Sequence, residues 1–411
     1  MGSWRLQSVT VIFLAVIAAL FAPFPGASQR RQPLDYAQLF DKTEVMIPAR
    51  DGVKLHTEIY APKNSREPLP ILFDRTPYGI SGGENGFSPI LNRYADLIPD
   101  GYIFVFQDIR GRYGSQGKFV MLHPLHDPTD PNGIDESTDA YDTIDWLVKN
   151  VPHNNGRVGV DGTSYPGFLV TMAMIHPHPA LRAVSEQACM GDVFLGDDFF
   201  HNGAFRLSYG FEYSAGLETS KENYSFPFDR FDLYDWYLRL GPLSNANARY
   251  FHGAIPTWND FIAHNSYDEF WKRHAVSYGL KDAAVPNLNV AGWWDQEDFY
   301  GPMTTYERLE KNGQEKSELP RGGALESWRL GERRGQFFGS HFFWQRHVYL
   351  FPPEDRGALV RLLAERQRCA SAQGSVAIPN RQRYLDSLRV LASSPGANPQ
   401  PLFPRKRQAI F

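Results

Sequence analysis

The amino-acid sequence predicts an α/β fold built on a doubly wound, mostly parallel sheet. Two short apolar runs, at 69–79 and 101–117, each end in a glycine-containing turn, and such runs are typical of parallel strands buried on both faces. A stretch with helical spacing follows at 135–150, then a strand and a turn at 156–167 and a helix at 168–177. This order of strand, helix, strand, turn and helix indicates a doubly wound sheet.

Length, charge and cysteine content limit the classes of function. The chain of 411 residues is long enough for two or three domains, or for one large α/β domain with insertions. Its 42 basic and 46 acidic side chains give a net charge of -4, without the polybasic character of proteins that bind nucleic acid or anionic membranes. Cys189 and Cys369 are too few for a disulfide framework. Small molecules are the expected partners.

Residues 1–28 have the pattern of a secretory signal peptide. Arg5 precedes an apolar run at 9–21, and small residues end the segment. We expect cleavage near Ser28 or Gln29 and a secreted or periplasmic protein. A retained membrane anchor is the alternative, although the run is shorter than the ~20 residues that span a bilayer.

The segments around these strands differ in character. Residues 44–62 alternate apolar and polar positions around an Arg-Asp-Gly turn, which indicates a β-hairpin. Residues 192–281 are rich in aromatic side chains and lack strand periodicity, so we expect a helical cap inserted between core strands. Residues 287–301 return to a buried strand that ends in an acidic loop. From 317 to 411 the chain is rich in arginine and shows no hydrophobic periodicity or repeat.

The stretch GVDGTSYPGFLV at 159–170 places Ser164 in a tight turn between a strand and a helix. A nucleophile elbow needs such a turn, because it lifts the hydroxyl clear of the sheet and aims the next backbone N–H at the oxyanion. The spacing G-x-S-x-G is not met, since Pro166 holds the place of the second glycine and Gly167 follows it. On spacing alone, a catalytic serine and an ordinary turn serine are both open.

Four separated motifs resemble one family when they are taken together. They are RTPYG at 75–79, QDIRGRYGSQG at 107–117, GTSYPGF at 162–168 and GWWDQEDFYG at 292–301. In this order they resemble the CocE/NonD (peptidase S15-like) serine hydrolases, which include glutaryl acylases, α-amino-acid ester hydrolases and Xaa-Pro dipeptidyl peptidases. The resemblance covers roughly residues 40–315 and implies an α/β-hydrolase fold over 29–316, with a helical cap at about 192–281.

The resemblance implies a role for four residues at the reacting centre. Ser164 would be the nucleophile, and Asp295, the first carboxylate of GWWDQED, would orient a histidine. The backbone N–H of Tyr165 and the hydroxyl of Tyr78 would form the oxyanion hole, because a rigid ring can hold an O–H at a developing charge. The alternatives are a turn or cap residue at Asp295 and a packing aromatic at Tyr78.

Three more carboxylates, Asp198, Glu297 and Asp298, match the positions that bind the α-ammonium group in α-amino-acid ester hydrolases. Carboxylates that share a pocket repel one another, and a cationic substrate group relieves that repulsion. The alternative is that they cap helices and form surface salt bridges. Arg110 and Arg112 are expected to tie their loop to core carboxylates.

The resemblance also implies a histidine about thirty residues after Asp295, in a motif like GPWxHGG, and then a β jelly-roll domain. Nothing after Asp295 matches either feature, and His341 and His347 lack the neighbours of the motif. Read one nucleotide later, codons permitted for LPRGGALESWRLG at 319–331 can encode the motif, and a second match follows in the same frame. We therefore interpret 317–411 as out-of-frame and poorly ordered, with the triad histidine unassigned and lost.

The sequence thus predicts an exported hydrolase that cleaves esters or amides of small acyl groups, with α-amino acids preferred, through a Ser164 acyl-enzyme. Without a histidine, only residual catalysis from the oxyanion hole and binding would remain. The alternatives are a glutaryl-type acylase or Xaa-Pro dipeptidyl peptidase, and a non-catalytic pseudoenzyme or binding protein. No metal, organic cofactor or nucleic-acid partner is implied, and a homo-oligomer, as in the full-length family, stays open.

Overall fold

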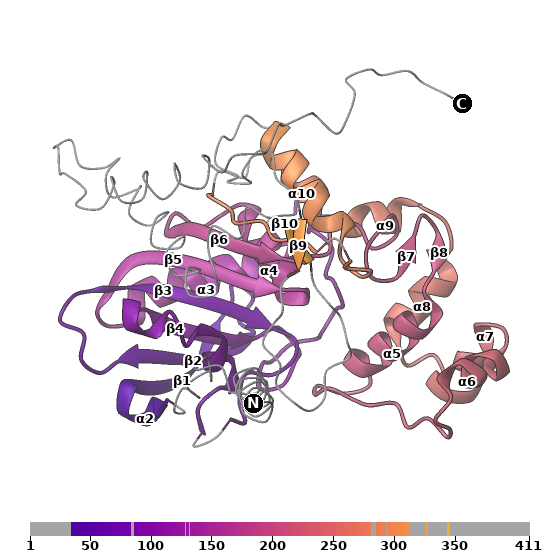
Figure 1. Cartoon of the computed structure of the whole chain (residues 1–411), viewed down its shortest axis with the longest axis horizontal. Helices are drawn as coiled ribbons and strands as arrows, with labels where there is room; N and C mark the ends of the chain where they lie inside the picture. The colour runs from indigo at the N-terminus through magenta and orange to yellow at the C-terminus, as the bar shows by residue number, and fades with distance from the viewer. Residues whose placement is uncertain are drawn as a thin grey trace, which may run out of the picture.

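The computed structural model describes residues 34–83, 86–127, 129–130, 132–280, 285–292, 294–311, 325–327 and 343–345. The predicted signal peptide lies outside these residues, as does nearly all of the predicted out-of-frame tail. The described part has a six-stranded sheet, with a group of helices to one side of it (Figure 1). Within this part, no helix has the length and apolar character that a membrane crossing needs.

The central sheet has the strand order β1-β2-β4-β3-β5-β6. Its strands are β1 (Phe40–Pro48), β2 (Lys54–Pro62), β3 (Leu69–Thr76), β4 (Ile103–Asp108), β5 (Asn154–Thr163) and β6 (Leu181–Gln187). The β1–β2 hairpin is antiparallel and joins β4 antiparallel, whereas β4, β3, β5 and β6 run parallel. The predicted α/β fold is confirmed, and the predicted hairpin extends one edge of the parallel sheet.

The segment after the cap differs from its prediction. We expected a buried strand at the start of 287–301. The segment pairs with β6 only through two isolated bridges, which join Asn287 to Val184 and Val290 to Gln187. Backbone bonds still hold it in place, since the N–H of Val290 donates to Glu186 O at 3.0 Å. The segment 287–290 therefore forms a short edge beside β6 that directs the acidic loop after it, but it is too short for a regular strand.

Successive side chains of β3 and β4 point to opposite faces of the sheet, and each face is covered by a hydrophobic core. Ile71, Phe73 and Val105 face the core under α3 (Glu136–Asn150) and α4 (Tyr165–Met174). On the opposite face, Leu72 and Phe104 pack with side chains of the 3₁₀ helices η2 (Pro89–Tyr94) and η3 (Ile98–Asp100) and the segment that joins them. This double covering explains why the two runs are apolar at every position rather than at alternate ones.

The helix α3 begins where the sequence predicts it. Asp135 caps its N-terminus, because its carboxylate accepts from the N–H groups of Ser137 and Thr138, and the Thr138 hydroxyl accepts in turn from the Asp135 N–H. Such a reciprocal cap satisfies backbone donors that have no partner inside the helix. The first turn of the crossover helix is thereby fixed beside the sheet.

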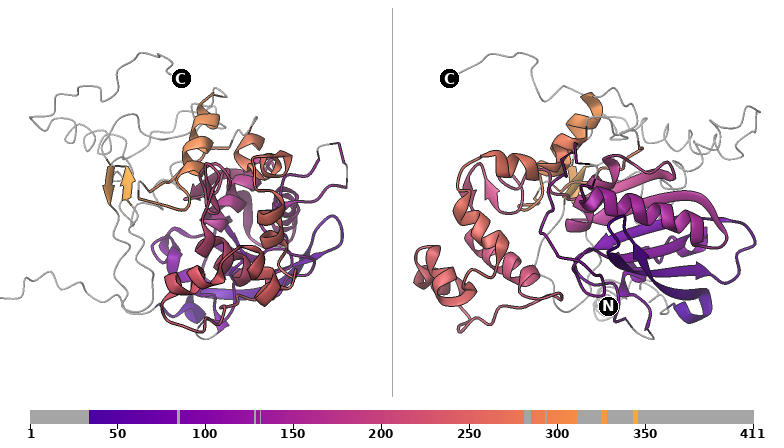
Figure 2. Two further views of the ribbon diagram at one scale, coloured as in Figure 1. Left: turned by 90° about the vertical axis from the view of Figure 1, so that its right-hand side faces the viewer. Right: turned by 180° about the vertical axis from the view of Figure 1, so that it is seen from behind.

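The predicted cap region is helical and lies to one side of the sheet (Figure 2). Its elements are the short strands β7 (Phe200–His201) and β8 (Ala204–Phe205) and the helices α5 (Leu207–Glu218), α6 (Leu233–Leu240), α7 (Ser244–Ala246), η4 (Asn247–Phe251), α8 (Pro256–Ala263), α9 (Glu269–His274) and η5 (Val276–Gly279). The centroid of the Phe211 ring lies within 5.5 Å of the ring centroids of Phe226, Trp236, Phe251 and Trp258. Aromatic packing, rather than regular strand pairing, therefore holds the cap together.

Four short elements complete the described chain. The helix α10 (Tyr300–Lys311) follows the acidic loop, α2 (Tyr36–Leu39) precedes β1, and the strands β9 (Leu325–Ser327) and β10 (Phe343–Gln345) pair with each other. The first turn of α10 lies directly on the segment after β6, because a Cβ atom at Gly301 would be 1.9 Å from Cys189 O. Gly301 also donates its N–H to Asp197 at 2.8 Å.

We expect Gly301→Ala to lower the free energy of unfolding by about 2–3 kcal/mol, as over-packing of a tight contact does. The Cβ atom would meet backbone atoms that cannot rotate away. Urea denaturation followed by circular dichroism measures the change. The matched control is Gly216→Ala in α5, where the added Cβ would lie 3.4 Å from Tyr224 O and should leave stability unchanged or slightly higher. Equal stability of Gly301→Ala and the parent would contradict this close approach.

Candidate active site

The residue between β5 and α4 has a strained backbone. Ser164 has φ 97° and ψ -115°, a conformation that residues with a side chain rarely adopt. Such strain costs on the order of 1–3 kcal/mol and collects at functional sites. Ser164 donates its N–H to Gln187 O at 2.9 Å and accepts from the N–H of Phe168 at 2.9 Å. The structure therefore shows Ser164 on a sharp strand-to-helix turn of the kind that an elbow requires.

Two glycines make this turn possible despite the unusual spacing. A Cβ atom at Gly162 would lie 2.4 Å from Pro166 O, and one at Gly167 would lie 2.6 Å from Gln187 O. Pro166 stands in the first turn of α4, where a missing N–H costs little. The extra residue before Gly167 is thus accommodated in the helix, and the second glycine serves to let α4 approach β6.

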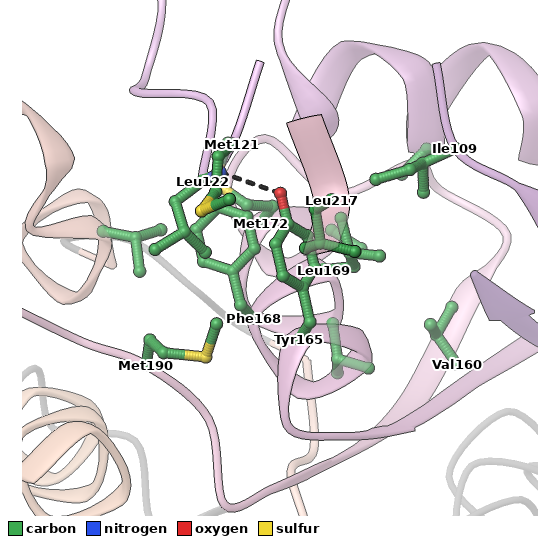
Figure 3. Packing of buried hydrophobic residues seen from close by; sticks show 14 of the residues in the cluster. Ile109, Met121, Leu122, Val160, Tyr165, Phe168, Leu169, Met172, Met190 and Leu217 are labelled. Carbon is green, nitrogen blue, oxygen red and sulfur yellow. Dashed lines mark hydrogen bonds between the residues drawn. The ribbon is translucent and has the colours of Figure 1, made fainter. Parts of the chain in front are cut away.

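Tyr165 begins α4 and keeps its ring in the core. The ring is fully buried among Phe168, Leu169 and other apolar side chains, and its hydroxyl accepts from the Leu122 N–H at 2.8 Å (Figure 3). As the first residue of α4, Tyr165 has an N–H without an acceptor inside the helix. The role implied for this N–H, which is to face the oxyanion, stays a prediction.

Tyr78 lies on the loop after β3, and its hydroxyl is 2.6 Å from the hydroxyl of Tyr213 in α5. The Tyr78 ring stands edge-on to the Tyr165 ring, with 6.5 Å between their centroids. Burial raises the pKa of Tyr78 above its ordinary value, so the phenol keeps its proton at neutral pH. Tyr78 therefore packs against the Tyr165 ring, and its role as an oxyanion donor stays a prediction.

Asp295 organises the acidic loop. Its Oδ1 accepts from the N–H groups of Glu297 at 2.9 Å and Asp298 at 3.0 Å, while its own N–H donates to Gly292 O at 3.1 Å. One carboxylate oxygen of Asp295 therefore fixes the turn that carries the next two carboxylates. The described residues contain no hydrogen bond between Asp295 and Ser164 or a histidine.

Backbone bonding brings the cap-side and loop-side carboxylates together. The N–H of Asp198 donates to Glu297 O at 2.9 Å, and Asp197 forms an antiparallel bridge with Asp298. Asp298 Oδ2 lies 3.5 Å from Ser164 Oγ. The three carboxylates implied to bind an ammonium group, Asp198, Glu297 and Asp298, are thus held together, with Asp298 beside the candidate nucleophile. Within the described residues, none of them forms a salt bridge.

This acidic cluster, Asp198, Glu297 and Asp298, is electrostatically costly. Burial, and then repulsion between the carboxylates, raises the pKa of Asp198 to about 7 and the pKa of Asp298 well above its ordinary value. Both Oδ atoms of Asp198 and Oδ1 of Asp298 are buried without a hydrogen-bond partner. Buried carboxylate oxygens normally have donors, so the cluster is suited to a ligand that brings a positive charge and several N–H groups.

Two side chains of the cap modify the cluster. Arg206 Nη1 donates to the main-chain O of Asp198 at 2.7 Å, and its guanidinium lies 4.6 Å from the centre of the Tyr209 ring. The charge of Arg206 and the nearby Tyr209 hydroxyl lower the pKa values of Asp198 and Glu297, against the larger effect of burial. Sequence reasoning missed both residues, although the tyrosine follows Asp198 within the same aromatic segment.

Ser164 has no imidazole partner in the described part of the chain, where its hydroxyl meets Asp298 instead. His201 interacts with the backbone of Gln296 in the acidic loop, and burial lowers its pKa. The predicted loss of the triad histidine concerns 317–411, of which the structure describes only 325–327 and 343–345. The described residues also hold no group of three or more His, Cys, Asp or Glu side chains that could bind a metal ion.

The two arginines of the loop after β4 have different partners. Arg110 ties its loop to Asp139 and Asp51, each at 2.6 Å, as predicted. The same prediction is wrong for Arg112, whose guanidinium donates to Pro77 O at 2.9 Å and to groups of the cap. Gly111, with φ 73°, separates the two arginines.

The loops that carry these residues all follow the carboxyl ends of parallel strands or of the short edge beside β6, which is where open α/β sheets place their sites. Together with the strained elbow, this arrangement defines a hydrolase of the α/β-hydrolase fold. The chain belongs to the X-Pro dipeptidyl-peptidase (S15) family, whose family model matches residues 51–328. The resemblance seen in the sequence is confirmed.

Two solved structures and one curated protein show the same relationship. An aminopeptidase from the marine sediment archaeon Thaumarchaeota archaeon is 39% identical, with a TM-score of 0.63 over 71% of this chain and 49% of that one. A selenomethionine-labelled α-amino acid ester hydrolase is also 39% identical, with a TM-score of 0.63 over 70% of this chain and 49% of that one. Cocaine esterase from Rhodococcus sp. (strain MB1 Bresler) is 28% identical over 62% of this chain and 44% of its own. The chain spans about half the length of these relatives.

The raised pKa of Asp198 predicts how stability depends on pH. The folded protein holds this proton up to about pH 7, whereas the unfolded chain loses it near the ordinary value of about 4. The folded state therefore binds more protons between these values, and the free energy of unfolding falls as pH rises from about 4 through about 7.

We expect Asp198→Asn to raise the free energy of unfolding by about 2–4 kcal/mol at pH 8 and by less than about 1 kcal/mol at pH 4, since one pKa unit corresponds to 1.36 kcal/mol. Urea denaturation at both pH values measures the difference. The control is Asp41→Asn on the edge strand β1, which is exposed and should change stability little at either pH. A gain for Asp198→Asn that does not depend on pH would contradict the assignment.

Proposed function

We propose that this protein is a serine hydrolase that cleaves esters or amides of α-amino acids through an acyl-enzyme on Ser164. The carrying observation is the distance of 3.5 Å between Ser164 Oγ and Asp298 Oδ2, within a cluster in which both Oδ atoms of Asp198 and Oδ1 of Asp298 are buried without a geometric hydrogen-bond partner. In an α-amino acid, the ammonium nitrogen lies about 2.5 Å from the carbonyl carbon, as bond lengths and angles require. A carboxylate beside the nucleophile therefore holds the ammonium group where the adjacent carbonyl meets Ser164.

The reaction follows from this placement. Ser164 Oγ attacks the carbonyl carbon and forms a tetrahedral oxyanion, which accepts from the Tyr165 N–H and the Tyr78 O–H. Collapse of this intermediate expels the alcohol or amine and leaves an ester on Ser164, which water then hydrolyses. The same chemistry serves an amino-acid ester and the N-terminal residue of a peptide, which is itself an α-amino-acid amide. The names of the two structural relatives describe these two reactions for those proteins.

The proton of Ser164 needs a general base. We infer that this base is the histidine encoded one nucleotide later, across the codons of Ser327 and Trp328, and that Asp295 orients it. The chain as written then hydrolyses substrate only at the residual rate that the oxyanion hole and binding supply. Sequencing of the gene and its transcript tests this inference, and one intact frame without such a histidine codon would contradict it.

The acidic cluster separates this proposal from its rivals. A glutaryl group is anionic, so buried carboxylates beside Ser164 would repel it. An Xaa-Pro dipeptidyl substrate carries its ammonium group one residue farther from the scissile carbonyl, beyond a carboxylate 3.5 Å from the nucleophile. A pseudoenzyme would bind the ammonium group without reacting at Ser164. We also propose export to a secreted or periplasmic location, on the pattern at 1–28, which N-terminal sequencing of the mature protein tests.

Labelling by a fluorophosphonate tests the nucleophile. We expect slow covalent labelling of the chain as written, none of Ser164→Ala, and hydrolysis of D-phenylglycine methyl ester at least about 10³-fold faster in a frame-restored chain, because a complete triad adds a general base. Mass spectrometry of the labelled peptide and a spectrophotometric assay measure these results. If both chains bind the ester but neither is labelled at Ser164, the pseudoenzyme is favoured instead.

Removal of one buried carboxylate tests the ammonium site. In the frame-restored chain we expect Asp198→Asn to raise KM for D-phenylglycine methyl ester by about 10- to 100-fold, since a hydrogen bond to a charged group contributes about 1.5–3 kcal/mol. The affinity should also fall below about pH 7, where Asp198 takes up its proton in the free protein.

The matched substrate for this experiment is methyl phenylacetate, which lacks only the amino group, and its KM should not change. The matched variant is Glu212→Gln, because Glu212 lies in α5, the helix that carries Tyr209, but its carboxylate accepts from the Tyr237 hydroxyl at 2.9 Å. An equal rise in KM for both esters would show that Asp198 supports the pocket rather than the ammonium group.

A further inference from the structure

One helix of the cap, α5, lies against three parts of the candidate site: the acidic cluster, Tyr78 and the core around Tyr165. Tyr209, Tyr213 and Leu217 are spaced four residues apart in α5, so they share one face. Tyr209 lies against the acidic cluster, Tyr213 meets the Tyr78 hydroxyl at 2.6 Å, and Leu217 packs in the cluster around Tyr165 (Figure 3). The position of α5 therefore affects the ammonium site, the oxyanion donor and the elbow together.

A buried arginine joins this helix to the loop that carries Tyr78. Arg112 is fully buried. Its Nε donates to Pro77 O at 2.9 Å, its Nη1 donates to Leu217 O at 2.5 Å and to Ser220 O at 2.7 Å, and its Nη2 donates to Asn223 Oδ1 at 2.7 Å. One guanidinium thus bridges the residue next to Tyr78 and the C-terminal end of α5.

The partners of Arg112 are carbonyl and amide oxygens, with no carboxylate among its hydrogen bonds. Burying a guanidinium costs several kcal/mol unless its donors are satisfied, and burial lowers the pKa of Arg112. The last carbonyls of α5 have no acceptor role inside the helix and carry the negative end of its dipole. These carbonyls can offset the positive charge of Arg112 only while the C-terminal end of α5 stays within hydrogen-bond distance of the guanidinium.

The hydroxyl pair sets a second requirement. The Tyr78 hydroxyl has one proton, which must point to the oxyanion when the tetrahedral intermediate forms. That proton is free only if Tyr213 donates to Tyr78 rather than accepts from it, and a chain of two donors strengthens both bonds. The loop is held on its other side by the Ile80 N–H, which donates to Asp108 at 3.1 Å.

We propose that Arg112 and Tyr213 are positioning residues that fasten α5 to the Tyr78 loop and direct the Tyr78 proton at the oxyanion. This inference rests on the proposed function, in which Tyr78 is an oxyanion donor. Arg112 sets where the helix and the loop meet, and Tyr213 sets the direction of the bond. Neither residue touches the reacting atoms.

Amide hydrogen exchange tests the fastening without any need for turnover. Arg112→Lys keeps the charge but loses the planar fork that reaches three segments. We expect faster exchange in two separated segments, 76–80 and 213–223. The matched control is Arg110→Lys, whose partners are Asp51 and Asp139, and it should leave both segments unchanged. Faster exchange confined to the arginine loop itself, 109–117, would overturn the proposal.

Binding of phenylboronic acid tests the direction of the proton, because its tetrahedral adduct with Ser164 places an oxygen in the oxyanion hole. We expect Tyr213→Phe to weaken boronate binding by about tenfold, a fraction of the loss seen when an oxyanion donor is removed. Binding of D-phenylglycine amide, a ground-state ligand, should not change. In the frame-restored chain, kcat should fall while KM stays the same. The control Tyr237→Phe removes another cap hydroxyl, the one bonded to Glu212, and should alter neither ligand.

Three results separate the outcomes. Equal boronate binding by the parent and Tyr213→Phe would overturn the role of Tyr213, and equal weakening of boronate and amide would show a merely structural effect. If the parent binds no boronate, the proposed function fails at Ser164, while the exchange experiment still supports or overturns the fastening by Arg112. Should Arg112→Lys not fold, Tyr213→Phe carries the exchange experiment as well.

Discussion

The close packing of the chain around Ser164 is the constraint on which the rest of the site depends. The elbow exists because Gly162 and Gly167 let backbone atoms approach where a side chain would not fit. The strain at Ser164 costs on the order of 1–3 kcal/mol, yet every residue of α4 is buried. Burying one large apolar side chain contributes about 1.5–3 kcal/mol, so Phe168, Leu169 and Met172 outweigh the strain. The strained backbone of Ser164 is therefore held in place by the packing of α4 in the core, and the long contact of its hydroxyl with Asp298 adds little.

The acidic cluster shows the opposite balance, since its members weaken the folded state. Asp198 and Asp298 are buried beside each other, and the backbone holds them there through the Asp198 N–H bond to Glu297 O and the bridge from Asp197. Arg206 offsets part of the charge from the side. A fold that keeps carboxylates in such positions stores free energy that a cation can release on binding. Functional sites commonly break the rules that stabilise the remainder of a protein.

The sequence predicts the sheet and the elbow well because both depend on local patterns. Apolar runs covered on both faces, the cap at Asp135 and the tight turn at Ser164 each follow from residues close together in the chain. The acidic loop was also placed correctly, because it follows the edge beside β6. The regular strand expected before it was wrong in form, since only isolated bridges join it to its neighbour.

The contacts of the cap could not be predicted from such patterns. Arg110 and Arg112 have the same chemistry two residues apart, but Gly111, at φ 73°, lies between them, and they have different partners. One then meets the carboxylates Asp51 and Asp139, and the other meets carbonyls more than a hundred residues away. The pairing of Tyr78 with Tyr213 likewise spans 135 positions. The cap segment has many aromatic residues, and nothing in its pattern shows which of them meets Tyr78.

The arrangement of α5 has a consequence for how the cap can move. Tyr209, Tyr213 and Leu217 lie on one face of a single helix, and Arg112 holds the end of that helix. A rotation or shift of α5 would change all three contacts at once, because a helix moves as a unit. Displacing α5 would break the Arg112 bonds to Leu217, Ser220 and Asn223, which are three of the four hydrogen bonds that its guanidinium donates. The loss of these bonds opposes motion of α5 away from the loop that carries Tyr78.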